Sequence, residues 1–102
     1  MKSLNFSYNW NKKLDGKFFT TLRTTNKYDV GDICHVTLKG TSQGMAQCVD
    51  KKIIWYGNLD VFTCGLDTGY GVKETQAILD KMYGGTDWTQ QELYLILFVK
   101  IK

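Results

Sequence analysis

Residues 92–101 constrain the fold more than any other part of this 102-residue chain. Most of this stretch is apolar, including Leu93, Leu95, Ile96, Leu97, Phe98 and Val99. Such a strand has no polar face to present to water, so both of its faces must be covered by other parts of the protein. The sequence therefore predicts that 92–101 is a central or barrel-closing strand.

The preceding residues predict a strand, a helical turn, three further strands and two helices. Alternation of apolar and polar residues predicts strands at 4–8, 19–23, 33–39 and 45–54. A helical turn is expected at 9–15, and helices are expected at 58–64 and 72–83. Glycines and polar residues mark the ends of these elements. Leu4, Phe6 and Tyr8 are expected to face inward, and residues 40–44 to form a hairpin loop. The order predicts a single α+β domain over residues 1–102. Its simplest form is a small mixed β-barrel with two or three short helices at one side, because closure removes exposed strand edges.

Arg23 is the only arginine in a chain with twelve lysines. Its planar fork of donors can hold a carboxylate, a phosphate or a base edge at two points, which a lysine cannot do. Strand alternation places Phe19, Thr21 and Arg23 on one face, with Thr20 and Leu22 on the other. The sequence therefore predicts a site near Arg23 and Thr21.

An alternative is that Arg23 only forms an ion pair. Asp29, Asp32 and Glu74 are the candidate partners for such a structural role. Thr21 alone is an ordinary strand threonine, favoured there by its branched side chain.

Charge and cysteine usage limit the function classes only loosely. The net charge of +3, with a pI of about 8.7, permits a polyanionic partner without requiring one. Cys34, Cys48 and Cys64 form no CxxC pair, which favours free thiols in a reducing cytoplasm. No stretch resembles a membrane span or a signal peptide, so we expect a cytoplasmic protein without membrane partners. Heavy lysine use hints at a bacteriophage or a low-GC bacterium.

No metal site or cofactor is predicted. His35 follows Cys34, but neighbours on a strand point to opposite faces and no second pair stands at ligand spacing. The loop 67–71 lacks the lysine and the glycine spacing of a phosphate-binding P-loop.

At Gly16, Thr21 and Arg23 the chain resembles the ASCH domain, a branch of the PUA-like β-barrels. These residues match the spacing of the family motif Gly-x-Lys-x-x-Thr-x-Arg, and Val30-Gly31-Asp32 resembles the family's Gly-Asp turn. The helix carrying Glu74, followed by the final strand, resembles its C-terminal half. The motif lysine is replaced here by Phe18.

The resemblance implies an RNA or nucleoside-like ligand in a cleft between barrel and helices. Small bacterial members resemble amidohydrolases that remove acetyl from 4-acetylcytidine with a lysine, a threonine and a glutamate. By this resemblance Thr21 would be the nucleophile and Glu74 the acid/base. Lys17 adjoins the missing lysine's position but points to the opposite face of an extended segment. The replacement by Phe18 favours binding over hydrolysis.

The first functional hypothesis is recognition of RNA or a nucleoside-like ligand. In it Arg23 grips a phosphate or polar edge, Tyr70 stacks on a base, and Thr21 and Glu74 orient the ligand. Lys17, Lys12 and Lys13 are candidate phosphate contacts.

Two alternatives remain open. One is an amidohydrolase in which Lys17 activates Thr21, and the other is a protein-interaction domain that has lost the ligand. Two residue roles also have structural alternatives. Glu74 can simply cap its helix, and Lys12 and Lys13 can belong to a solvated polar turn.

Overall fold

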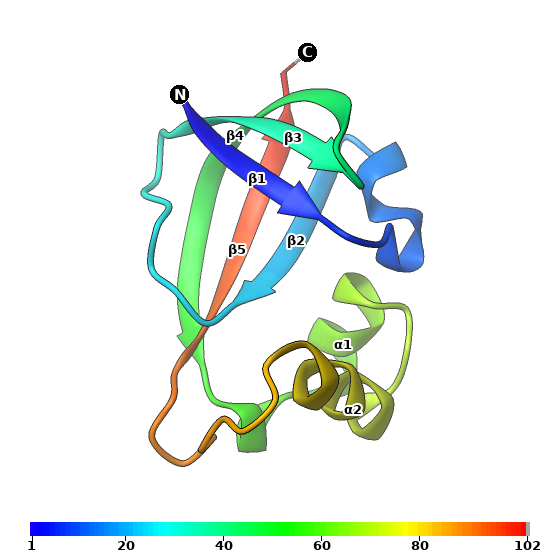
Figure 1. The fold of residues 1–102 in the computed structure, drawn as a ribbon, viewed down its shortest axis with the longest axis vertical. Helices are drawn as coiled ribbons and strands as arrows, with labels where there is room; N and C mark the ends of the chain where they lie inside the picture. Colours follow the sequence, from blue (N-terminus) through cyan, green and yellow to red (C-terminus); the bar gives the residue numbers. More distant parts are fainter. Residues whose placement is uncertain (102) are drawn as a thin grey trace.

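The computed structural model describes residues 1–101, which form one five-stranded mixed sheet with two α-helices and two short 3-10 helices (Figure 1). The strands are β1 (Lys2–Phe6), β2 (Phe18–Arg23), β3 (Ile33–Leu38), β4 (Thr41–Ile54) and β5 (Leu93–Lys100). The helices are η1 (Trp10–Asp15), η2 (Tyr56–Asn58), α1 (Val61–Asp67) and α2 (Val72–Met82). The strand order is β1-β3-β4-β5-β2, with β1 parallel to β3 and the other pairs antiparallel.

Strand β5 lies inside the sheet, and none of its residues is exposed: Leu93, Ile96 and Phe98 are buried, and the others are half-buried. It pairs with β4 along one edge and with β2 along the other. Ile96 and Phe98 belong to the core enclosed by the curved sheet, whereas Leu93 and Leu95 pack with the residues of the two α-helices. The prediction of a central strand is therefore confirmed, and so is the α+β class.

The sheet is open, so a closed barrel is not observed. Within residues 1–101, β1 and β2 are the two edge strands and do not pair with each other. Side chains span the gap instead. Arg23 Nη2 on β2 donates to the carbonyl oxygen of Asn5 on β1 at 3.0 Å, and Phe6 meets Phe19 edge-on at 6.0 Å between centroids. A cleft can therefore open beside the edge strand β2, where the functional residues were predicted.

Helix α1 begins later and ends later than predicted. Asp60, rather than Asn58, is its N-cap, because the Asp60 side chain accepts from the Thr63 amide at 2.7 Å. The helix then continues through Gly65 to Asp67. An internal glycine costs only about 1 kcal/mol, and the fully buried Cys64 anchors this segment in the core.

Strand β1 ends two residues before its predicted end. Leu4 and Phe6 are buried as expected, but Tyr8 is 52% exposed and packs against Trp10 at 4.4 Å between ring centroids. The predicted loop 40–44 is also wrong. Lys39 and Gly40 turn the chain with φ of 51° and 82°, so β4 already starts at residue 41. Positive φ at both positions matches the twist of a two-residue hairpin turn.

The three cysteines are free and buried, which predicts a loss of stability at alkaline pH. Burial raises the pKa of the Cys34, Cys48 and Cys64 thiols above their ordinary value of 9.0. Above pH 9 the unfolded chain therefore loses thiol protons that the folded chain keeps, so the free energy of unfolding falls as pH rises. We expect each thiol to lower the free energy of unfolding by up to about 1.4 kcal/mol per pH unit in this range.

Urea denaturation between pH 7.5 and 10.5 measures this slope, and Cys48→Ala should make it shallower. A pH-independent transition midpoint would contradict the expectation.

Candidate functional site

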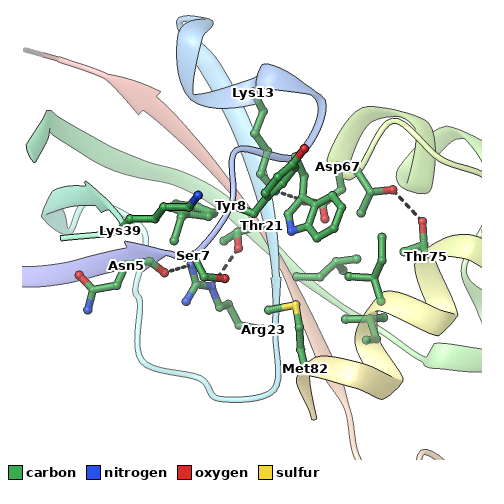
Figure 2. A pocket seen from close by; sticks show the side chains of 16 residues that line it. Asn5, Ser7, Tyr8, Lys13, Thr21, Arg23, Lys39, Asp67, Thr75 and Met82 are labelled. Carbon is green, nitrogen blue, oxygen red and sulfur yellow. Dashed lines mark hydrogen bonds and ion pairs between the residues drawn. The ribbon is translucent and has the colours of Figure 1, made fainter. Parts of the chain in front are cut away.

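A cleft of about 380 Å³ lies beside the edge strand β2, between the end of β1 and helix α2 (Figure 2). Its volume falls within the range of about 300–1,000 Å³ that is typical of small-molecule sites. The lining residues are Asn5, Phe6, Ser7, Tyr8, Trp10, Lys13, Thr21, Leu22, Arg23, Lys39, Asp67, Thr68, Thr75, Ile78, Leu79 and Met82. Apolar side chains from the sheet and α2 make most of the wall, and a few polar groups converge on it.

Thr21 and Arg23 form the polar centre of the cleft. Arg23 Nε donates to Thr21 Oγ1 at 2.9 Å, and the guanidinium carbon lies 4.9 Å from the centre of the Phe6 ring. Thr21 is buried and Arg23 is half-buried. These contacts hold the guanidinium in one orientation while leaving it at the wall of the cleft, as Figure 2 shows.

The three carboxylates considered as partners of Arg23 are engaged elsewhere. Asp29 pairs with Lys51 at 3.2 Å, and Asp32 pairs with Lys2 at 2.6 Å. Glu74 Oε2 accepts from the Gly71 amide at 2.8 Å. None of the ion pairs formed within residues 1–101 involves Arg23. Its positive charge is therefore not neutralised by a carboxylate of the described chain.

A buried ion pair lies at another wall of the cleft. Lys13 Nζ donates to Asp67 Oδ1 at 2.9 Å, with the two side chains only 5% and 6% exposed. Thr20 Oγ1 donates to the same carboxylate oxygen at 2.9 Å. Burial lowers the pKa of Lys13, and the neighbouring Asp67 opposes that shift. The ammonium also lies 5.3 Å from the centre of the Phe6 ring, so the two cations, Lys13 and Arg23, share one aromatic neighbour.

The backbone of η1 explains why Lys13 points inward. Asn11 and Lys12 have φ values of 57° and 50°, so the chain turns sharply before Lys13. Asn11 Nδ2 donates to the carbonyl oxygen of Gly65 at 3.1 Å and joins this turn to α1. The prediction of a solvated turn is confirmed for Lys12, which is exposed, and is wrong for Lys13.

Glu74 lies outside the cleft. Its side chain is exposed and turns back onto the Gly71 amide at the start of α2. That contact confirms its capping role and places it away from Thr21. The buried polar residue that α2 brings to the cleft is Thr75, which shares a hydrogen bond with Thr68 at 2.8 Å.

Tyr70 and Lys17 also lie outside the cleft. Tyr70 is 51% exposed and meets Trp10 edge-on at 6.2 Å, in a separate shallow depression. Lys17 is exposed and does not line the cleft, and the neighbouring Phe18 is 58% exposed. Tyr8 and Trp10 both line the cleft and the shallow depression, so they are the aromatic side chains best placed to contact a ligand, and Trp10 offers the larger flat ring.

Residue spacing did not reveal several cleft residues. Lys13, Asp67 and Thr75 are close only because η1, α1 and α2 meet beside β2. The available signal was weak. In the sequence, Asp67 and Thr68 stand in a Gly-rich stretch between the two predicted helices, which is a common place for polar site residues.

Comparisons with protein-family models, curated proteins and solved structures gave no match. Within residues 1–101 there is no group of three or more histidine, cysteine or acidic side chains that could hold a metal ion. Over the same residues, none of the helices has both the length and the hydropathy needed to cross a bilayer.

Proposed function

We propose that the cleft binds a nucleoside or nucleotide unit, either free or as part of RNA. The observation that carries this proposal is the fixed guanidinium of Arg23, which has no carboxylate partner in residues 1–101 and stands at the wall of a largely apolar cleft. An apolar slot with Trp10 suits a base, and a guanidinium suits a phosphate or a base edge.

The ASCH resemblance supports the same proposal. The family's ligand site is expected between sheet and helices, and the cleft has that position, with Thr21 and Arg23 of the motif in its wall. In this scheme Arg23 grips the phosphate or base edge, Thr21 orients it, and Trp10 takes the stacking role first assigned to Tyr70. Glu74 and Lys17 have no part in contacting the ligand.

Narrowing the cleft is expected to abolish binding. Met82, at the end of α2, lines the cleft and is 51% exposed, so Met82→Trp can add bulk there without disturbing the core. The matched control is Lys81→Trp, since Lys81 is exposed on the same helix and does not line the cleft. Calorimetric titration with the four ribonucleoside 5′-monophosphates measures the affinity. Wild type and Lys81→Trp should bind, and the affinity of Met82→Trp should be at least tenfold lower. Equal affinities in all three proteins would remove the cleft from the binding site.

An amidohydrolase acting on an acylated nucleoside such as 4-acetylcytidine is a second candidate. One observation favours it: Lys13, whose pKa is lowered by burial against the opposing effect of Asp67, lines the same cleft as the Thr21 hydroxyl, and in this candidate it would give up a proton and its bond to Asp67 to act as the base. A threonine needs a nearby base to act as a nucleophile. This candidate predicts release of acetate from 4-acetylcytidine and its loss in Thr21→Val. If wild type releases no acetate, the cleft serves for binding alone.

A protein-interaction role is the third candidate, and it rests on a different surface. Val61, Phe62 and Leu66 of α1 are 73%, 83% and 64% exposed and border one apolar depression. Exposed apolar groups gathered in this way are typical of contact surfaces. This role is compatible with ligand binding in the cleft.

A further inference from the structure

A second depression adjoins the cleft on the other side of Arg23. Its volume is about 500 Å³, and its lining residues are Lys2, Ser3, Asn5, Arg23, Lys27 and Tyr28. Asn5 and Arg23 line both hollows. The two hollows therefore lie next to each other along the gap between β1 and β2, and the guanidinium with its bond to the Asn5 carbonyl lies between them.

The second depression is positively charged. Lys2, Arg23 and Lys27 line it, and none of its lining residues is acidic. The charge of Lys2 is partly offset by Asp32, which it contacts at 2.6 Å. Lys27 is exposed and forms no ion pair within residues 1–101. A depression with this lining attracts anions, and its wall is less apolar than that of the cleft.

The positions of these charges match a chain of nucleotides better than a single one. A free mononucleotide would fill the cleft and place its one phosphate at Arg23, leaving Lys27 without a role. In a strand, the phosphodiester on one side of the bound nucleoside lies at Arg23 and the next sugar and phosphate continue toward Lys27. The backbone then follows the open edge of the sheet.

We propose that the ligand is single-stranded RNA, with one nucleoside in the cleft, its phosphodiester on Arg23, and the adjoining nucleotide in the depression lined by Lys2 and Lys27. This inference rests on the proposed function and adds the second depression as a backbone site. Arg23 is the shared contact, because its Nε is held by Thr21 and its Nη2 by the Asn5 carbonyl, which fixes the guanidinium across the gap at the border of the two hollows.

The test compares ligands of different length on two matched variants. Affinities of the four ribonucleoside 5′-monophosphates and of a mixed-sequence RNA hexanucleotide are measured for wild type, Lys27→Gln and Lys73→Gln. Lys73 is an exposed lysine of α2 that lines neither hollow. We expect the hexanucleotide to bind at least tenfold more tightly than any mononucleotide. Lys27→Gln should weaken hexanucleotide binding about three- to tenfold, leave mononucleotide binding unchanged, and lower the salt slope of hexanucleotide binding by about 0.7. Lys73→Gln should change neither affinity.

Two results would overturn the inference. If mononucleotides bind as tightly as the hexanucleotide and Lys27→Gln has no effect, the ligand is a free nucleotide, and the proposed function of the cleft stands without the second depression. If neither ligand binds the wild-type protein, the proposed function fails together with the inference.

Discussion

Replacing Asp67 with alanine is expected to lower the free energy of unfolding by about 3–5 kcal/mol, because it leaves the Lys13 ammonium buried without its partner. The pair is almost completely enclosed, with side chains 5% and 6% exposed, so water cannot take the place of the carboxylate. Thr20 loses the same acceptor. Urea denaturation at pH 7 measures the effect.

The control for this prediction is the double variant Lys13→Met/Asp67→Leu. Replacing both charges with apolar side chains of similar size is often neutral or stabilising, so the double variant should regain most of the loss. A loss below about 1 kcal/mol in Asp67→Ala would contradict the account, since it would mean that Lys13 reaches water.

The same variant should show a characteristic pH dependence. Burial lowers the pKa of Lys13 from 10.5, and removal of Asp67, which opposes this shift, should lower it further. Between that lowered value and 10.5 the unfolded chain binds a proton that the folded chain does not, so this lysine makes stability rise with pH. The difference in the free energy of unfolding between wild type and Asp67→Ala should therefore become smaller as the pH increases toward 10.5.

Arg23→Ala is expected to weaken ligand binding roughly 10- to 100-fold, because hydrogen bonds to a charged group contribute about 1.5–3 kcal/mol. Titration calorimetry with the ligand that binds wild type most tightly measures the change. The affinity of Arg23→Lys should lie between those of wild type and Arg23→Ala, because lysine keeps the positive charge but lacks the two-point donor geometry of the guanidinium. The charge should also make wild-type affinity fall with rising salt.

Arg23 also joins the two edge strands, so its removal must be separated from unfolding. Its only described bonds are to Thr21 Oγ1 and the Asn5 carbonyl, in a half-exposed position, and the domain should remain folded without them. Thermal unfolding of Arg23→Ala checks this. A folded variant with unchanged affinity would remove Arg23 from the site.

Local pattern predicted most of the secondary structure. The apolar run of β5 indicates a strand with protein on both faces. In β2, successive side chains point to opposite faces, which is why Phe19, Thr21 and Arg23 could be placed correctly on one face. The open sheet could not be inferred in the same way. It depends on β1 pairing with β3 in parallel rather than with β2, a choice between distant strands that no local period encodes.

Of the five residues predicted to contact a ligand, Thr21 and Arg23 line the cleft, whereas Lys17, Tyr70 and Glu74 do not. Thr21 and Arg23 were found because strand geometry relates residues two apart. The pairing of Lys13 with Asp67 was missed because it joins residues 54 apart in the sequence. It also depends on two local exceptions, the positive φ angles before Lys13 and the continuation of α1 through Gly65.

The most direct test of the proposed site is a nuclear magnetic resonance titration of the labelled protein with ribonucleoside 5′-monophosphates. We expect the backbone amide signals of Lys13, Thr21, Arg23 and Thr75 to shift together and to saturate at one common dissociation constant. These residues come from η1, β2 and α2 and meet only at the cleft. Saturable shifts confined to other surfaces, such as Val61 and Phe62 of α1, or no shift with any of the four nucleotides, would contradict the assignment of the cleft as a nucleotide site.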